Sequence, residues 1–352
     1  MQKEKFGTTK DGREVTRYTL TNQNGMKVSF IDLGAVITNI WVPDRDGNFD
    51  DVVHGYDDVA SYEVNEPSFG APVGRCANRI SDGHFTINGV EYKLDQNDST
   101  NCLHSGFLRF NYLMYEAEYE KGDGEEILTF SRISPDGEQH FPGNFTYSIT
   151  YHLTDDDELI IDYEGVSDAD TVVNMTNHSY FNLNGEGSGT AMDQYLTIHA
   201  KYYTPVADSH SIPTGVYEEV AGTPMDFRTA KQIGQDIEAE FDQLKFTGGY
   251  DHNYVTDNYA KGNRRLIATA YSDKTGIAMD VTSDCPCVQF YAANFVENEH
   301  GKNGHTYNKR DAFCLETQVE PNAVNVEDFH SPILNAGEQY DSVTAYHFYI
   351  RK

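Results

Sequence analysis

Two stretches of the sequence carry ionisable side chains whose neighbours could adapt them to proton transfer. In NMTNHSYFNLNG, residues 174–185, a strand would place His178 on one face with other polar side chains. In AFCLETQVEPNAVN, residues 312–325, the same alternation places Glu316 on a face with Cys314. Loss of hydration beside such weakly polar neighbours raises the pKa of a carboxyl group and makes its carboxylate a better base. An exposed strand glutamate is an equally good interpretation of Glu316 taken alone.

The face that carries His178 is rich in hydrogen-bonding groups. It offers donors, acceptors and one flat ring, which match the hydroxyl groups and the apolar face of a sugar. A solvated outer face is the alternative, but such faces usually carry Lys and Glu, and this one has neither. We therefore interpret this face as the floor of a sugar site. Its members are Asn174, Thr176, His178, Tyr180 and Asn182.

Three further segments contain residues that could contact a ligand. VGRCANRISDG holds Arg75, Asn78 and Arg79 in a turn flanked by glycines, and arginine presents a rigid fork of donors to paired oxygens. NCLHSGFLRF holds His104, and GGYDHNYV places Asp251 after two glycines, where a loop enters a strand. Each signal is weak alone, because arginines in turns often pair with acidic neighbours and single histidines are often structural.

Known metal and phosphate motifs are not recognisable. Cys285 and Cys287, with His300 and His305 further on, do not have a common zinc spacing, so buried thiols are the simpler interpretation. The sequence has no glycine-rich phosphate loop, dinucleotide fingerprint or nucleophile elbow.

Short alternating segments must position these residues. Asn88-Gly89 separates two alternating runs and predicts a hairpin, and residues 145–153 and 159–163 alternate as two further strands. Residues 342–350 predict a C-terminal strand. Many short strands without a linker predict an all-β fold, a large antiparallel β-sandwich formed as a single domain over residues 1–352.

Two helices are expected beside these strands. Ile233, Ile237, Phe241 and Leu244 recur at helical spacing within residues 229–244. A shorter helix is expected near residues 58–64.

Composition narrows the class of protein. No apolar run reaches the ~18 residues of a membrane helix, and the first residues are polar, so we expect a cytoplasmic protein with no membrane partner. The formal net charge of −30 repels phosphate backbones and excludes nucleic acid as an expected partner. The five cysteines, an odd number, indicate reduced thiols.

Taken together and in this order, the motifs resemble the aldose 1-epimerases, also called galactose mutarotases. The matching segments are GRCANRI, LHSG, PGNFTYSITY, NMTNHSYFNLNG, GGYDHNYV, VQFYAANF and LETQVEPNAVN. Ser105 in LHSG and Asn322 in EPNA depart from the usual family residues, glycine and aspartate.

The resemblance implies a galactose mutarotase-like sandwich that interconverts the α and β anomers of aldohexoses without a metal or organic cofactor. It also implies a small-molecule sugar as substrate and leaves a homodimer open. Glu316 corresponds to the general base and His178 to the general acid. Residues expected to hold the sugar hydroxyls are Arg75, His104 and Asp251, with Asn78 and Gln289 as weaker candidates.

The chemistry of ring opening explains why a carboxylate such as Glu316 and an imidazole such as His178 suit the reaction. A base removes the proton of the anomeric hydroxyl, an acid protonates the ring oxygen, and the two exchange roles when the ring closes. We expect Glu316 to be ionised and the opposed carboxylate to raise the pKa of His178. The alternatives are an epimerase of a reducing disaccharide such as maltose, a glycosidase that uses Glu316 with Asp251, and a non-catalytic sugar-binding relative.

Overall fold

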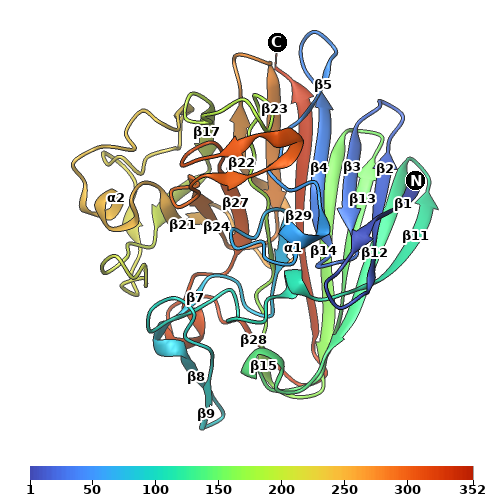
Figure 1. Ribbon diagram of the computed structural model, residues 1–352. Helices are drawn as coiled ribbons and strands as arrows, with labels where there is room; N and C mark the ends of the chain where they lie inside the picture. Colours follow the sequence, from blue (N-terminus) through green and yellow to red (C-terminus); the bar gives the residue numbers. More distant parts are fainter. Residues whose placement is uncertain (352) are drawn as a thin grey trace.

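The computed structural model describes residues 1–351 and consists mainly of antiparallel β-strands with a few short helices (Figure 1). The predicted all-β fold is therefore confirmed. Its largest unit is a nine-stranded sheet in which three strands from the C-terminal part of the chain lie between two groups of strands from its middle. In spatial order its strands are β11 (Glu116–Gly122), β12 (Glu125–Ser134), β13 (Phe145–Thr154), β14 (Glu158–Ser167), β29 (Gln339–Ile350), β23 (Ile277–Ser283), β22 (Arg265–Tyr271), β17 (Tyr195–Ile198) and β20 (Lys231–Gln232).

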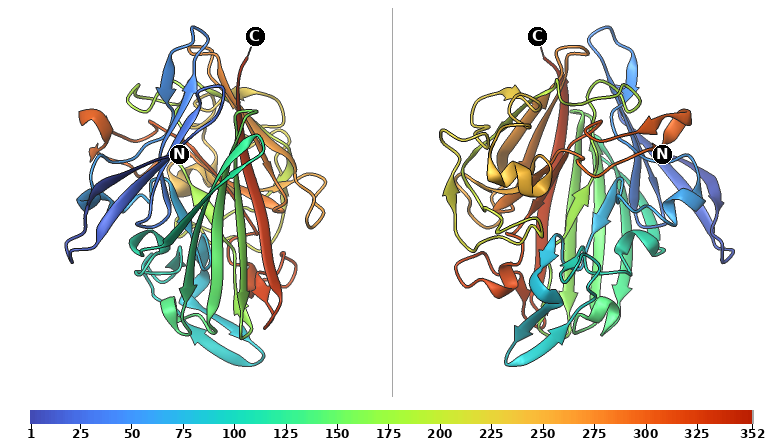
Figure 2. Two further views of the ribbon diagram at one scale, coloured as in Figure 1. Left: turned by 90° about the vertical axis from the view of Figure 1, so that its right-hand side faces the viewer. Right: turned by 60° about the vertical axis from the view of Figure 1, so that its left-hand side comes forward.

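Two five-stranded sheets accompany the large sheet. The N-terminal one, blue in Figures 1 and 2, fans out beside β12 and β13 (Figure 2). It comprises β1 (Gln2–Thr8), β2 (Glu14–Thr21), β3 (Lys27–Ile31), β4 (Val36–Pro43) and β5 (Phe49–Asp51). The other, which carries much of the candidate site, comprises β19 (Glu218–Glu219), β18 (Ala200–Tyr203), β21 (Asp251–Thr256), β24 (Cys287–Tyr291) and β27 (Cys314–Gln318).

Short strand pairs and helices connect these sheets. The pairs are β6 (Ala71–Val73) with β16 (Thr176–His178), β7 (Arg79–Ile80) with β10 (Cys102–Leu103), β8 (His84–Ile87) with β9 (Val90–Lys93), β15 (Thr171–Val172) with β28 (Ile333–Leu334), and β25 (Glu299–His300) with β26 (Thr306–Tyr307). The α-helices are α1 (Val59–Tyr62) and α2 (Asp242–Thr247). Single 3₁₀ turns cover Ser81–Gly83, Phe110–Tyr112, Glu138–His140, Lys302–Gly304 and Ala323–Asn325.

Alternation of side chains explains the central strands. In β13 the residues that the period-2 pattern assigns to one face, from Phe145 to Leu153, are buried, and the residues between them are exposed or half-buried. In β14 the same holds for Leu159, Ile161 and Tyr163. The predicted hairpin at Asn88-Gly89 is confirmed as the turn between β8 and β9.

Aromatic and polar contacts join the layers. Phe30 of β3 packs on Tyr151 of β13 with ring centroids 4.5 Å apart, which seals the N-terminal sheet against the large one. The second five-stranded sheet is joined to the large sheet by a hydrogen bond between the hydroxyl groups of Thr317 in β27 and Thr344 in β29. One continuous buried apolar cluster reaches from Tyr18 to Phe348. The site strands are therefore held on a rigid base.

The helix predicted over residues 229–244 is largely wrong, because only α2 is helical there. Ile233 and Ile237 are buried as the pattern indicates, yet the chain around them is extended or turned. The backbone N–H of Ile233 donates to the carbonyl oxygen of Gln194, so tertiary pairing replaces the helical hydrogen bond. The short helix expected near residues 58–64 is confirmed as α1.

The segment 174–185 is only briefly a strand. Within it, β16 spans three residues, and residues on both of its faces are buried, so the predicted polar face is not a single exposed floor. The Asn174 side-chain oxygen accepts the Val319 N–H, and the Asn182 amide donates to two carbonyl oxygens. These side chains stabilise loops. Along residues 1–351, no helix combines the length and apolar character that membrane crossing requires.

Candidate active site

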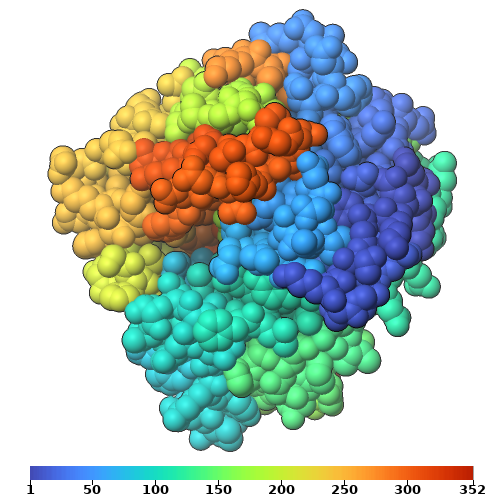
Figure 3. Space-filling model, in the orientation of Figure 1, coloured from blue at the N-terminus to red at the C-terminus, as the bar shows by residue number. Residues whose placement is uncertain are grey.

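A cavity of about 360 Å³ opens where the second five-stranded sheet meets the segments around β7, β10 and β16. Figure 3 shows the face of the molecule on which these segments meet. Cavities of this size are typical of small-molecule sites. Six of the seven residues that the sequence assigns to the site line it, namely Asn78, His104, His178, Asp251, Gln289 and Glu316.

The register of the sheet brings three of these residues onto one surface. Gln289 of β24 lies opposite Glu316 of β27 and, on its other side, opposite Asn253 of β21. Asp251 lies two residues before Asn253, so its side chain points to the same face. The amide of Gln289 donates to Asp251 Oδ1 at 2.7 Å. Strand pairing thus places two carboxylates and an amide side by side.

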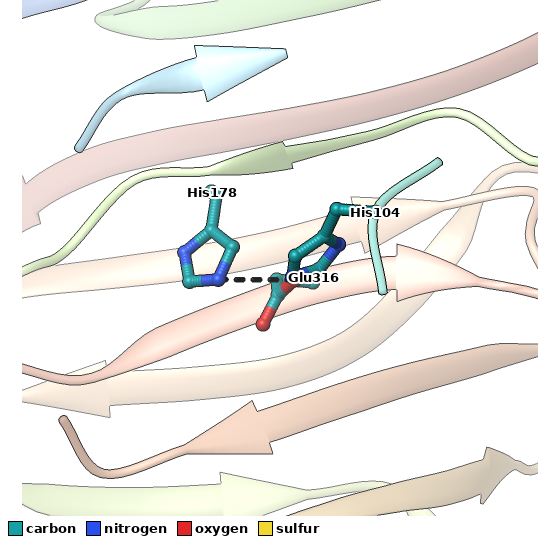
Figure 4. A group of neighbouring side chains, drawn as sticks. All are labelled: His104, His178 and Glu316. Carbon is teal, nitrogen blue, oxygen red and sulfur yellow. Dashed lines mark ion pairs between the residues drawn. The ribbon is translucent and has the colours of Figure 1, made fainter. Parts of the chain in front are cut away.

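His178 reaches this surface from β16, which pairs with β6 and contacts β27. Its Nε2 lies 3.6 Å from Oε2 of Glu316, and the two side chains point toward one another (Figure 4). The imidazole stacks on Tyr180 with centroids 5.0 Å apart and an interplanar angle of 16°. Its Nδ1 lies 3.5 Å from Sγ of Cys314. The imidazole of the general-acid candidate is therefore supported on one face by Tyr180 and contacted at its Nδ1 edge by Cys314.

His104 is fixed by a reciprocal contact with Asn78. The Asn78 N–H donates to His104 Nδ1 at 3.2 Å, and the His104 N–H donates to the Asn78 carbonyl oxygen at 3.0 Å. Both residues have left-handed backbones, with φ of 60° and 51°, a conformation that non-glycine residues adopt mainly where the surroundings impose it. The neighbouring Ser105 hydroxyl is turned away to the Cys76 backbone.

Arg75 does not lie on the cavity, so the expectation that it holds a sugar hydroxyl is corrected. Its side chain is fully buried, and its guanidinium donates to the carbonyl oxygens of Pro142 and Gly143 and to the hydroxyl group of Ser134. Arg79, four residues later, lines the cavity instead. Its Nε donates to a carboxylate of Asp98 at 2.7 Å, which leaves Nη1 3.9 Å from Asp251.

Burial dominates the electrostatics of the pair. Burial, and then the negative charge of Asp251, raise the pKa of Glu316 well above its usual value, as the sequence indicates. Burial lowers the pKa of His178 to about 3, which contradicts the expected increase. The main cause is the loss of hydration at this depth, and the positive charge of Arg109 lowers the pKa of His178 further. Glu316 Oε2 is itself buried and accepts no hydrogen bond from the described residues.

The spacing of three side chains would also suit a metal ion. One ligand atom from each of His104, His178 and Glu316 lies within 4.8 Å of the others. Two imidazoles and a carboxylate form the ligand set of some catalytic zinc sites. Within residues 1–351 no comparable group forms around the cysteine pair at 285 and 287.

Comparison with known proteins places this geometry in context. The family model described as aldose 1-epimerase matches residues 16–347. The chain belongs to the aldose 1-epimerase family. It is 38% identical to the galactose mutarotase of Rattus norvegicus over 344 residues, 97% of both chains, and 34% identical to the aldose 1-epimerase of Escherichia coli K12 over 341 residues, 96% of both. The crystal structure of galactose 1-epimerase from Lactobacillus acidophilus matches with a TM-score of 0.87 at 26% identity, covering 100% of this chain and 99% of that one.

Membership of the aldose 1-epimerases confirms the resemblance inferred from the motifs. Several cavity residues are not among those that the resemblance assigns to the sugar site, including Arg79, Arg109, Tyr291 and Phe295. A signal existed for Arg79, because GRCANRI contains two arginines and only one of them was chosen. Arg109 and Phe295 carry no local pattern, because nothing in a loop sequence shows which side chains turn toward a distant cavity.

Proposed function

We propose that this chain is an enzyme, an aldose 1-epimerase, that interconverts the α and β anomers of aldohexoses such as galactose and glucose. Glu316 acts as the general base and His178 as the general acid. The names of the relatives, galactose mutarotase and aldose 1-epimerase, support the activity. The observation that carries the assignment of roles is the 3.6 Å approach of His178 Nε2 to Glu316 Oε2 within a sugar-sized cavity.

The geometry matches the two atoms that exchange protons. O1 and O5 of a pyranose are both bonded to C1, so a base and an acid that converge on one point reach both oxygens. Glu316 takes the proton of the anomeric hydroxyl while the C1–O5 bond breaks and the C1=O1 bond forms. His178 gives its Nε2 proton to O5. Rotation about C1–C2 presents the other face of the carbonyl, and the reverse transfers close the ring.

This cycle needs one proton in the Glu316–His178 pair at every stage. In the closed-ring complex the proton is on His178, and after opening it is on Glu316. The pKa directions in the structure, raised for Glu316 and lowered for His178, correspond to the second arrangement. Sugar hydroxyl groups at Glu316 Oε2 replace lost hydration and favour the charged pair. The enzyme thus gains or loses no net proton during turnover.

The other polar residues hold the sugar while its ring opens. We propose that His104, Arg79 and the Asp251–Gln289 pair bind the hydroxyl groups, with Asn78 supporting His104. Arg79 and Asp251 are already partly paired with each other, so they offer a donor and an acceptor at one place. We infer that residues 1–352 act as one domain, since the buried cluster from Tyr18 to Phe348 underlies the whole site.

Polarimetry on freshly dissolved α-galactose and α-glucose tests the proposal. We expect the wild type to accelerate the drift in optical rotation and Glu316→Gln to lower kcat by about 10²–10⁴. Glu297→Gln, at an exposed carboxylate of the same cavity, is the matched control and should keep the rate. Isothermal titration with galactose measures binding independently of catalysis.

Each other outcome would replace the proposal. Sugar binding without acceleration would indicate a non-catalytic sugar-binding protein. Release of free sugar from an aryl glycoside would indicate a glycosidase. Acceleration for maltose but not for either hexose would transfer the activity to reducing disaccharides.

A further inference from the structure

The two histidines of the site differ in what contacts their Nδ1 atoms. At His104, a backbone N–H, that of Asn78, points at Nδ1 from 3.2 Å. At His178, the Sγ of Cys314 lies 3.5 Å from Nδ1. A backbone N–H can only donate, whereas a thiol sulfur can also accept a hydrogen bond weakly. The contact therefore fixes the position of the proton in neutral His104, whereas at His178 either ring nitrogen could carry it.

The contact with the Asn78 N–H allows only one tautomer of neutral His104. Nδ1 must accept from the Asn78 N–H, so the one proton of the neutral ring is on Nε2. Burial lowers the pKa of His104 well below its usual value, which keeps the ring neutral. His104 therefore presents an Nε2–H that can donate to a sugar oxygen but cannot accept a proton.

His178 needs the opposite arrangement if it exchanges a proton with the ring oxygen through Nε2. As an acid it carries protons on both nitrogens, and after donation it must keep the proton on Nδ1. Nε2 then has the lone pair that takes the proton back from O5 when the ring closes. An Nδ1–H in a buried site needs an acceptor, since an unpaired buried donor is costly. Cys314 Sγ is at that position.

We propose that Cys314 is a positioning residue whose sulfur accepts a hydrogen bond from Nδ1–H of His178 and so holds the tautomer whose Nε2 shuttles the proton. This inference rests on the proposed epimerase function. Cys314 lies two residues before Glu316 on β27, so one strand supplies both the base and the support of the acid. Its side chain is fully buried, and burial raises its pKa well above the usual value, so it stays a thiol.

A thiol suits this position better than a carboxylate. A carboxylate would hold the proton on the imidazole more tightly and would add a third negative group beside Glu316 and Asp251. A neutral sulfur is a weak acceptor, so it orients the ring without weakening it as an acid.

The tautomers also bear on metal binding at His104, His178 and Glu316. Histidines that bind metals donate their other N–H to an acceptor, as we propose for His178. His104 has its proton on Nε2, the nitrogen that would have to bind the ion. The group is thus arranged for proton transfer despite its metal-like spacing.

The test combines NMR with kinetics. In ¹⁵N-histidine-labelled enzyme near neutral pH, we expect the His178 signals to show a protonated Nδ1 and a bare Nε2, and the His104 signals to show the reverse. Cys314→Ala should lower kcat on galactose about three- to tenfold with little change in KM, as expected for losing one weak hydrogen bond. It should also move the His178 proton toward Nε2. Cys314→Ser, which restores an acceptor, should recover most of kcat and the wild-type signals.

Cys285→Ala is the matched control, because Cys285 is a buried thiol beside a different cavity. A wild-type spectrum with the His178 proton on Nε2 would overturn the inference, and so would unchanged kinetics and spectra in Cys314→Ala. The wild-type spectrum is independent of turnover. If the wild type does not accelerate mutarotation, the proposed function fails whatever the tautomers prove to be.

Discussion

Replacing Arg75 and Arg79 by alanine, one at a time, should separate folding from sugar binding in a turn where the two residues look alike. Arg75 is fully buried and has no carboxylate partner within the described chain. Its guanidinium makes five hydrogen bonds, to the oxygens of Pro142, Gly143, Thr171 and Ser134. Arg79 is partly exposed on the cavity and is paired with acidic side chains.

The expected size of the two effects follows from these environments. Removing the Arg75 side chain leaves several buried acceptors unpaired, each costing about 1–3 kcal/mol, although water entering the space would satisfy some of them. We therefore expect Arg75→Ala to lower the free energy of unfolding by about 3–5 kcal/mol. Arg79→Ala removes partly solvated ion pairs and should cost about 1 kcal/mol.

Sugar binding should be affected in the opposite order, with Arg79→Ala changing KM more than Arg75→Ala. Arg79→Ala removes a donor from the cavity wall and should raise KM for galactose about tenfold or more, because hydrogen bonds to charged groups contribute about 1.5–3 kcal/mol. Arg75→Ala, where folded, should keep KM near the wild-type value. Urea unfolding followed by tryptophan fluorescence and polarimetric kinetics at several galactose concentrations supply the two measurements. A wild-type unfolding midpoint for Arg75→Ala together with a raised KM would refute this assignment of the two arginines.

Three further predictions concern buried charge. The pKa of Glu316 is raised in the folded state, so its protonated form stabilises the fold below about pH 4.5 and this contribution is lost as pH rises through the folded-state pKa. Glu316→Gln should therefore unfold at a higher urea concentration than the wild type at about pH 9. The difference between the two proteins should vanish near about pH 4. Because the pKa of Glu316 is raised and that of His178 is lowered to about 3, Glu316 holds the proton of the pair near neutral pH. We therefore expect that kcat/KM, measured by polarimetry, does not fall between about pH 5.5 and about pH 7.5, where an imidazolium of ordinary pKa would lose its proton. Lys302 is buried, and its Nζ donates to Asp51 at 2.6 Å. Lys302→Met should therefore lower the free energy of unfolding in urea by about 3–5 kcal/mol, and adding Asp51→Asn should recover part of that loss. Purely additive effects of the two substitutions would contradict the pairing.

Local sequence patterns predicted much of the strand framework. The alternation in residues 145–153 and 159–163 follows from strand geometry, and Asn88-Gly89 marks its hairpin because both residues accept positive φ. The helix expected over residues 229–244 failed for a physical reason. An apolar spacing reports which side chains are buried, but the backbone partner of Ile233 is Gln194, which no local pattern reveals.

The properties of the site likewise divide into those that local sequence predicted and those that depend on the tertiary structure. The sequence by itself determined the residue types needed for acid-base chemistry and, through its motifs, the family to which they belong. It also indicated a raised pKa for Glu316, because the small side chains beside it on the strand are local information. Only the tertiary structure decided that Arg79 rather than Arg75 lines the cavity, that burial lowers the pKa of His178, and that Cys314 lies against its Nδ1. Those properties depend on distances and on loss of hydration between segments far apart in the chain, and neither is encoded in local spacing.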